Sequence, residues 1–76
     1  MVVTIRGKAY RMSRKEAEKF LEKMKSNVPL GIYAVEKNGC IEMRNDKCKS
    51  ITQLKEQKRD LKRRGFKVYY NTGSPK

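Results

Sequence analysis

Residues 31–44 read GIYAVEKNGCIEMR, and this stretch predicts the centre of the fold. Two runs rich in apolar residues are divided by Asn38-Gly39, a pair that tolerates the positive φ angles of a type I′ turn. A two-residue turn at this position pairs Lys37 with Cys40. The sequence therefore predicts an antiparallel hairpin centred on Asn38-Gly39.

The register of this hairpin assigns its side chains to two faces, because successive residues of a strand point to opposite sides. Continued outward from the turn, the register pairs Tyr33 with Arg44. The expected core-facing residues are Ile32, Ala34, Ile41 and Met43. The opposite, amphipathic face is expected to carry Tyr33, Val35, Cys40, Glu42 and Arg44.

The segment before the hairpin, SRKEAEKFLEKMKS, has the pattern of a helix. Ser13 is expected to cap the first turn while the Glu16 side chain reaches back to the cap. The apolar residues then recur at helical spacing and predict a core-facing stripe. This stripe consists of Ala17, Phe20, Leu21 and Met24.

A second helix is predicted after the hairpin, from Ile51 to Arg64. Ser50 begins the cap-like pattern SITQ, with Gln53 at the reciprocal position. Gly65 is expected to end the helix because glycine adopts the left-handed conformation readily.

The two ends of the chain add strands to this arrangement. The opening VVTIRGKAYRM predicts either one strand or a hairpin, with a tight turn at Gly7-Lys8 and a return strand over residues 9–11. FKVYY, residues 66–70, predicts a last strand, with Phe66, Val68 and Tyr70 on one face. Residues 1–71 are expected to form one domain, and residues 72–76 a flexible tail.

The elements together predict a small single α+β domain in the order β(β)-α-β-β-α-β. Alternation of helices with short strands around a hairpin favours an antiparallel sheet with both helices packed on one face. A ferredoxin-like arrangement fits if the opening segment is a single strand. Seventy-six residues suffice for one domain only.

Positive charge dominates the composition, with 20 Lys/Arg against 8 Asp/Glu and a net charge of +12. This balance favours a polyanionic partner, either nucleic acid or an anionic membrane surface. A membrane surface is disfavoured because the second helix has few large apolar residues to insert. The excess charge concentrates in the second half of the chain.

The second helix and its flanks form the predicted nucleic-acid-binding site. Its like charges at i, i+4 spacing oppose helix formation, which favours a functional reason for keeping them. A solvated helix face is the alternative reading. Tyr33 and Tyr69 are expected on the open sheet face, where aromatic rings could stack bases, but their high strand propensity is the favoured explanation because no RNP-type motif is present. The predicted site comprises Tyr33, Arg44, Lys47, Lys49, Lys55, Arg59, Lys62, Arg63, Lys67 and Tyr69, and its cations are expected to form one continuous positive surface.

No catalytic or metal site is predicted. The chain has no histidine and only two cysteines, and the paired ligand spacing of zinc sites is absent. Lys47 and Lys49 flank Cys48, and their charges would lower its pKa, but no histidine can serve as its base. We expect no enzyme activity and no cofactor. The two cysteines and the lack of a signal peptide or membrane span favour the cytoplasm.

Two functions remain open from the sequence. The first is a small, basic, non-enzymatic protein that binds DNA or RNA, chiefly through phosphates. The second is a small regulator or inhibitor, of the kind that phages and mobile elements encode, that binds a host protein through its open sheet face or a strand edge. The form of the nucleic acid and the oligomeric state stay undetermined.

Overall fold

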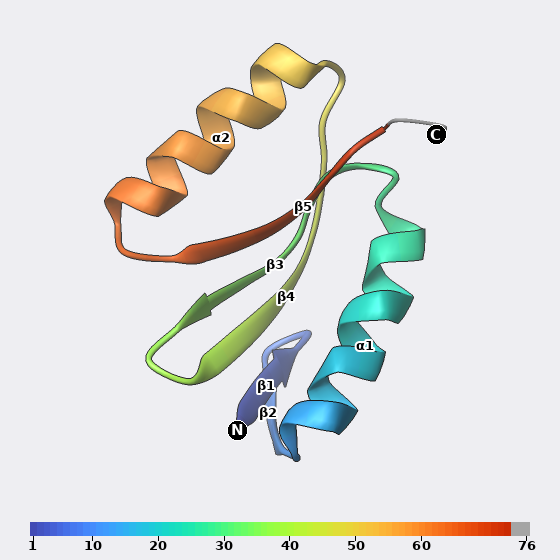
Figure 1. The fold of residues 1–76 in the computed structure, drawn as a ribbon, viewed down its shortest axis with the longest axis vertical. Helices are drawn as coiled ribbons and strands as arrows, with labels where there is room; N and C mark the ends of the chain where they lie inside the picture. Colours follow the sequence, from blue (N-terminus) through green and yellow to red (C-terminus); the bar gives the residue numbers. More distant parts are fainter. Residues whose placement is uncertain (74–76) are drawn as a thin grey trace.

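Seven elements form in the predicted order, and they confirm a small α+β fold (Figure 1). The computed structural model describes residues 1–73, which contain two helices and a five-stranded mixed sheet. The elements are β1 (Val2–Ile5), β2 (Lys8–Arg11), α1 (Arg14–Asn27), β3 (Leu30–Lys37), β4 (Cys40–Lys47), α2 (Ile51–Arg63) and β5 (Lys67–Thr72).

Both hairpins turn through residues with positive φ. At the central turn Asn38 and Gly39 have φ of 54° and 78°, and Lys37 pairs with Cys40 as predicted. The opening segment is a hairpin as well. Its turn is Arg6-Gly7, with φ of 52° and 84°, and the expected turn at Gly7-Lys8 is wrong by one residue.

The helix ends follow the local signals in the sequence. The Oγ of Ser13 accepts a hydrogen bond from the backbone N–H of Glu16, and the Glu16 carboxylate completes the capping box. Ser50 caps α2 through the N–H of Gln53, whose side chain accepts from the N–H of Lys49. After α2, Gly65 has a φ of 91°, the left-handed conformation expected there.

The sheet has the strand order β2-β1-β4-β3-β5, and it is mixed rather than antiparallel. β1 runs parallel to β4, with Val3 beside Ile41, whereas the other neighbouring pairs are antiparallel. The ferredoxin-like alternative depends on a single opening strand, and residues 2–11 form a hairpin instead. β5 extends to Thr72, so the predicted tail starts too early; residues 74–76 of that tail lie outside the described residues.

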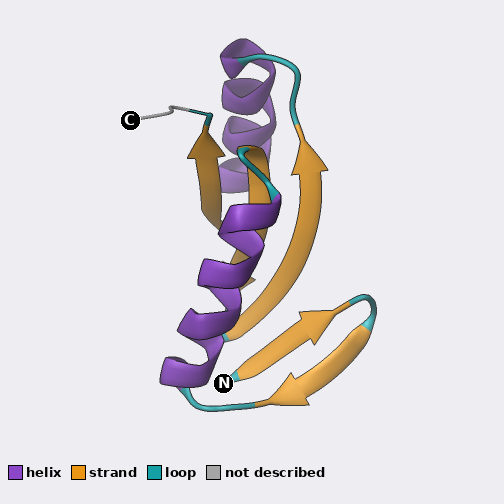
Figure 2. Ribbon diagram, turned by 90° about the vertical axis from the view of Figure 1, so that its right-hand side faces the viewer, coloured by secondary structure: helices purple, strands orange, loops and turns teal. Residues whose placement is uncertain are grey.

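The expectation that both helices pack on one face of the sheet is wrong, because α1 and α2 cover opposite faces (Figures 1 and 2). Two separate cores result. The core under α1 contains Val3, Ala17, Leu21, Val28, Tyr33, Ala34 and Ile41. The core under α2 contains Ile32, Val35, Cys48, Leu54, Leu61 and Val68.

An irregular step in β3 explains why the predicted faces differ from the observed ones. The register of β3 against both neighbouring strands shifts between Ile32 and Ala34. Tyr33 and Ala34 therefore both face α1, whereas Ile32 and Val35 face α2. A strand buried on both faces carries an almost continuous apolar run, and GIYAV at residues 31–35 is such a run.

Candidate nucleic-acid interface

The helix α2 buries Leu54 and Leu61 against the sheet and exposes its cations. Helical spacing places Lys55, Lys58 and Lys62 together on one flank of the helix. The Nζ of Lys58 lies 4.1 Å from the centre of the Tyr70 ring, so this flank faces β5. Arg59 and Arg63 continue the positive surface toward solvent, and both are exposed. We define the α2 cation surface as Lys55, Arg59, Lys62 and Arg63.

None of these four side chains takes part in an ion pair within residues 1–73. The ion pairs there involve two other arginines. Arg64 contacts Asp60 at 3.4 Å, and Arg44 contacts Glu42 at 3.6 Å and also Asp46. The charges of the α2 cation surface are therefore available to an external anion.

Arg44 and Lys47 lie on the other flank of α2, where a hollow of about 530 Å³ separates the helix from β4. Asp46, Asp60 and Gln57 line the same hollow. Because carboxylates stand between the two sets of cations, Arg44 does not extend the α2 cation surface into one continuous positive face. Lys49 is exposed at the start of α2, directly before the N-cap residue Ser50.

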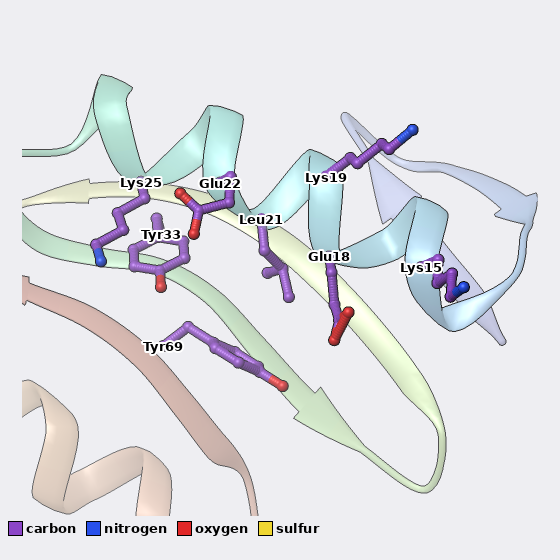
Figure 3. Close-up of a pocket in the computed structure, with 8 residues that line it drawn as sticks. All are labelled: Lys15, Glu18, Lys19, Leu21, Glu22, Lys25, Tyr33 and Tyr69. Carbon is purple, nitrogen blue, oxygen red and sulfur yellow. The ribbon is translucent and has the colours of Figure 1, made fainter.

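Tyr33 and Tyr69 lie on the face of the sheet that α1 covers, not on an open face. Tyr33 is only 8% exposed. The two ring centres are 6.1 Å apart, with 46° between the ring planes. They line a groove of about 640 Å³. Figure 3 shows them there with side chains of α1, most of them charged. The residues from α1 are Lys15, Glu18, Lys19, Leu21, Glu22 and Lys25.

A carboxylate affects the hydroxyl group of each tyrosine. The Oη of Tyr69 donates a 2.7 Å hydrogen bond to Glu36, and burial together with this carboxylate raises the pKa of Tyr69 to about 12. Burial, and then the charge of Glu22, raises the pKa of Tyr33. Lys67 is on the same side, with its Nζ 5.2 Å from the Tyr69 ring centre. Lysines and carboxylates are mixed around this groove, and the burial of Tyr33 leaves little ring area on which a base could stack.

The structure adds Tyr70 and Lys58, which the sequence reasoning left out of the site. Tyr70 is 38% exposed, and the Nζ of Lys58 lies over its ring, on the flank of α2 that also carries Lys55 and Lys62. The strand pattern predicts the same face for Tyr70 and Val68. Tyr70 pairs with Ile32 and therefore lies on the face that α2 covers. It lies outside the row of residues that the helix buries. Only Lys58 could have been found from the sequence, because helical spacing puts it at the margin of the apolar stripe of α2, beside Lys55 and Lys62.

Cysteine and metal chemistry have little support in the described part of the chain. Cys48 is buried, and its pKa is raised by burial and by Asp46, so the expectation that Lys47 and Lys49 lower it is wrong.

Within residues 1–73 no three His, Cys, Asp or Glu side chains gather into a group that could hold a metal ion. Neither helix in that range has the length and apolarity needed to cross a membrane.

Comparisons with protein-family models, with curated proteins and with solved structures gave no significant match.

Proposed function

We propose that this chain is a small, non-enzymatic nucleic-acid-binding protein that contacts phosphates through the α2 cation surface. The observation that supports the proposal is that Lys55, Arg59, Lys62 and Arg63 are exposed side by side with no ion-pair partner in the described residues. Cations held in this way displace counterions from a nucleic acid, which gives affinity without sequence information.

The dimensions of the helix agree with such contacts. Lys55 and Arg63 are eight residues apart, which is about 12 Å along a helix axis. Phosphates of one DNA strand are spaced by about 3.4 Å along the duplex axis, so the surface spans roughly three to four of them. Tyr70 lies beside the cations and adds exposed aromatic area on which an unpaired base can stack.

The test is a fluorescence-anisotropy titration with duplex DNA, single-stranded DNA and an RNA hairpin at several salt concentrations. Four phosphate contacts predict that log K falls with log salt concentration with a slope of about −3 to −4. The double variant Arg59→Glu/Arg63→Glu should abolish binding and leave the fold intact.

A matched control is available on α1, where Lys19 and Lys23 are also exposed and also four residues apart. Lys19→Glu/Lys23→Glu changes the net charge by the same amount. If both double variants lower the affinity equally, binding follows net charge alone and the proposed site is wrong.

The second function, a regulator that binds a protein partner, also has an observation in its favour. β4 is longer than the strand that pairs with it on one side, which leaves part of a strand edge free. Binding of a partner at this edge does not depend on nucleic-acid binding by α2.

A further inference from the structure

The edge of β4 is only partly covered. β1 pairs with β4 at Cys40, Ile41 and Glu42, whereas β4 continues to Lys47. Figure 2 shows the β1–β2 hairpin turning away from the upper part of β4. In the described chain, residues 43–47 therefore have a neighbouring strand on the β3 side alone. Such an edge presents backbone N–H and C=O groups that a further strand can pair with.

A hollow of about 800 Å³ lies beside this free edge, between α1 and the tip of the β1–β2 hairpin. Its apolar side chains are Ile5, Met24 and Met43, all of them half-buried. Methionine side chains are flexible and polarisable, so they adapt to different apolar partners. We refer to these three residues as the apolar floor of the hollow.

The polar residues around the apolar floor are cationic or neutral. They are Arg6, Asn27, Arg44, Asn45 and Lys47, and none of the described lining residues is acidic. The charge of Arg44 is already balanced by Glu42 and Asp46. Arg6 and Lys47 therefore supply the free positive charge, one at each side of the hollow.

We propose that an extended, acidic peptide segment of a partner protein binds here by adding a strand to β4 along residues 43–47. Its backbone pairs with the free strand edge, in the manner of β-strand addition. One apolar side chain of the peptide packs on Ile5, Met24 and Met43. Its carboxylates lie against Arg6 and Lys47.

Two other occupants fit this site less well, one because of its charge and one because of its chemistry. A second copy of the chain also carries a net charge of +12, so two copies repel each other. A nucleic acid has no peptide backbone with which to continue the sheet, and the apolar floor offers its phosphates no partner. An acidic peptide can pair its backbone with the strand edge, pack an apolar side chain on the apolar floor and place carboxylates against the two cations.

The first experiment uses a fluorescein-labelled nine-residue peptide in which Glu alternates with Val, and a protein labelled at the methionine methyl groups for NMR. We expect saturable shifts of the Met24 and Met43 methyl signals, and slower hydrogen exchange of amides in residues 43–47. A peptide with proline at alternate positions should bind about tenfold more weakly, because proline has no backbone N–H to donate to the strand edge.

Two double variants separate this site from the α2 cation surface. Arg6→Asp/Lys47→Glu should weaken peptide binding by about tenfold, because two surface charge pairs with the peptide are lost. It should leave oligonucleotide binding unchanged, because neither residue belongs to the α2 cation surface. Aspartate is chosen at position 6 because φ there is 52°, a conformation that Asp tolerates. Arg59→Glu/Arg63→Glu should leave peptide binding unchanged.

The proposal is overturned if the proline peptide binds as well as the alternating one, or if Arg59→Glu/Arg63→Glu removes peptide binding. It is also overturned if an oligonucleotide, and not the peptide, shifts the Met24 and Met43 signals. The methyl shifts are measured on the unaltered protein, so the test stands even where a variant fails to fold.

Discussion

Gly31, at the start of β3, lies where the backbone leaves no room for a side chain. Its φ is 145°, and a Cβ added there would overlap the backbone carbonyl oxygen of Asp46 on β4. Only glycine adopts such a conformation without strain. Gly39, in the central turn, also has a positive φ, but a Cβ there would meet no atom within 4 Å.

We expect Gly31→Ala to destabilise the protein by at least about 3 kcal/mol, because backbone strain and a steric overlap add. Gly39→Ala should cost only about 1–2 kcal/mol, the penalty of the left-handed conformation alone. Urea denaturation followed by circular dichroism measures both. Equal losses for the two variants would contradict the close approach of β3 and β4.

The phenol of Tyr69 gives the protein a pH dependence in the alkaline range. Its pKa in the folded state is about 12, above the ordinary value of 10, because of burial and the hydrogen bond to Glu36. The folded state holds this proton more tightly than the unfolded state does. The stabilisation is therefore complete below about pH 10 and is lost as the pH rises toward 12.

Tyr69→Phe removes this proton, and it should also cost about 1 kcal/mol at neutral pH through the lost hydrogen bond. Urea denaturation of both proteins between pH 9 and about 11.5 is the measurement. We expect the difference in stability between them to shrink as the pH rises. A constant difference would show that the phenol titrates alike in the folded and unfolded chain.

At the scale of elements, α2 combines good local signals with an unfavourable charge pattern. Ser50 caps its start, and Lys62 and Arg63 in its last turn interact favourably with the helix dipole. Lys55, Arg59 and Arg63, however, are like charges at i, i+4 spacing, and each such pair costs about 0.2–0.5 kcal/mol. If the helix binds phosphates, the charge of Arg59 strengthens binding but lowers the stability of the helix.

Arg59→Glu should therefore raise the free energy of unfolding by about 0.5–1 kcal/mol while it weakens nucleic-acid binding. The new carboxylate replaces two repulsions with attractions to Lys55 and Arg63. Urea denaturation at low salt and the anisotropy titration measure the two effects separately. A variant that is both less stable and weaker in binding would indicate that Arg59 has a structural role in the fold.

At the scale of the whole molecule, one sheet separates two small cores, and within residues 1–73 Arg44 and Arg64 are the only cations in ion pairs. The molecule extends over 34 × 27 × 19 Å. The Debye length is about 30 Å at 0.01 M salt and about 8 Å at 0.15 M. At low salt, then, cations at opposite ends of the molecule repel each other, and a net charge of +12 destabilises the folded state.

We expect the melting temperature to rise with sodium chloride between 0.01 and 0.15 M. A gain of about 1 kcal/mol corresponds to about 4–8 °C for a domain of this size. Replacing the four residues of the α2 cation surface by Gln should reduce the rise. Thermal melts followed by circular dichroism measure it, and a melting temperature that falls with salt would show that attractive ion pairs dominate.

The sequence by itself determined the elements of this protein, because their signals act over a few residues. The Asn38-Gly39 turn, the Ser13 capping box, the Ser50 cap and Gly65 after α2 all occur as predicted. The exposed cations of α2 are also readable from helical spacing. These features depend on backbone conformation and on contacts within about four residues, which the sequence order alone supplies.

Only the tertiary structure decided which face each side chain occupies. The apolar run at residues 31–35 has no alternation, so it does not reveal that β3 is buried on both sides. The shift between Ile32 and Ala34 arises from pairing with β4 and β5, strands that are distant in sequence. That shift buried Tyr33 under α1. The packing of α1 and α2 on opposite faces and the short pairing of β1, which leaves the edge of β4 free, likewise depend on contacts between residues far apart in the sequence.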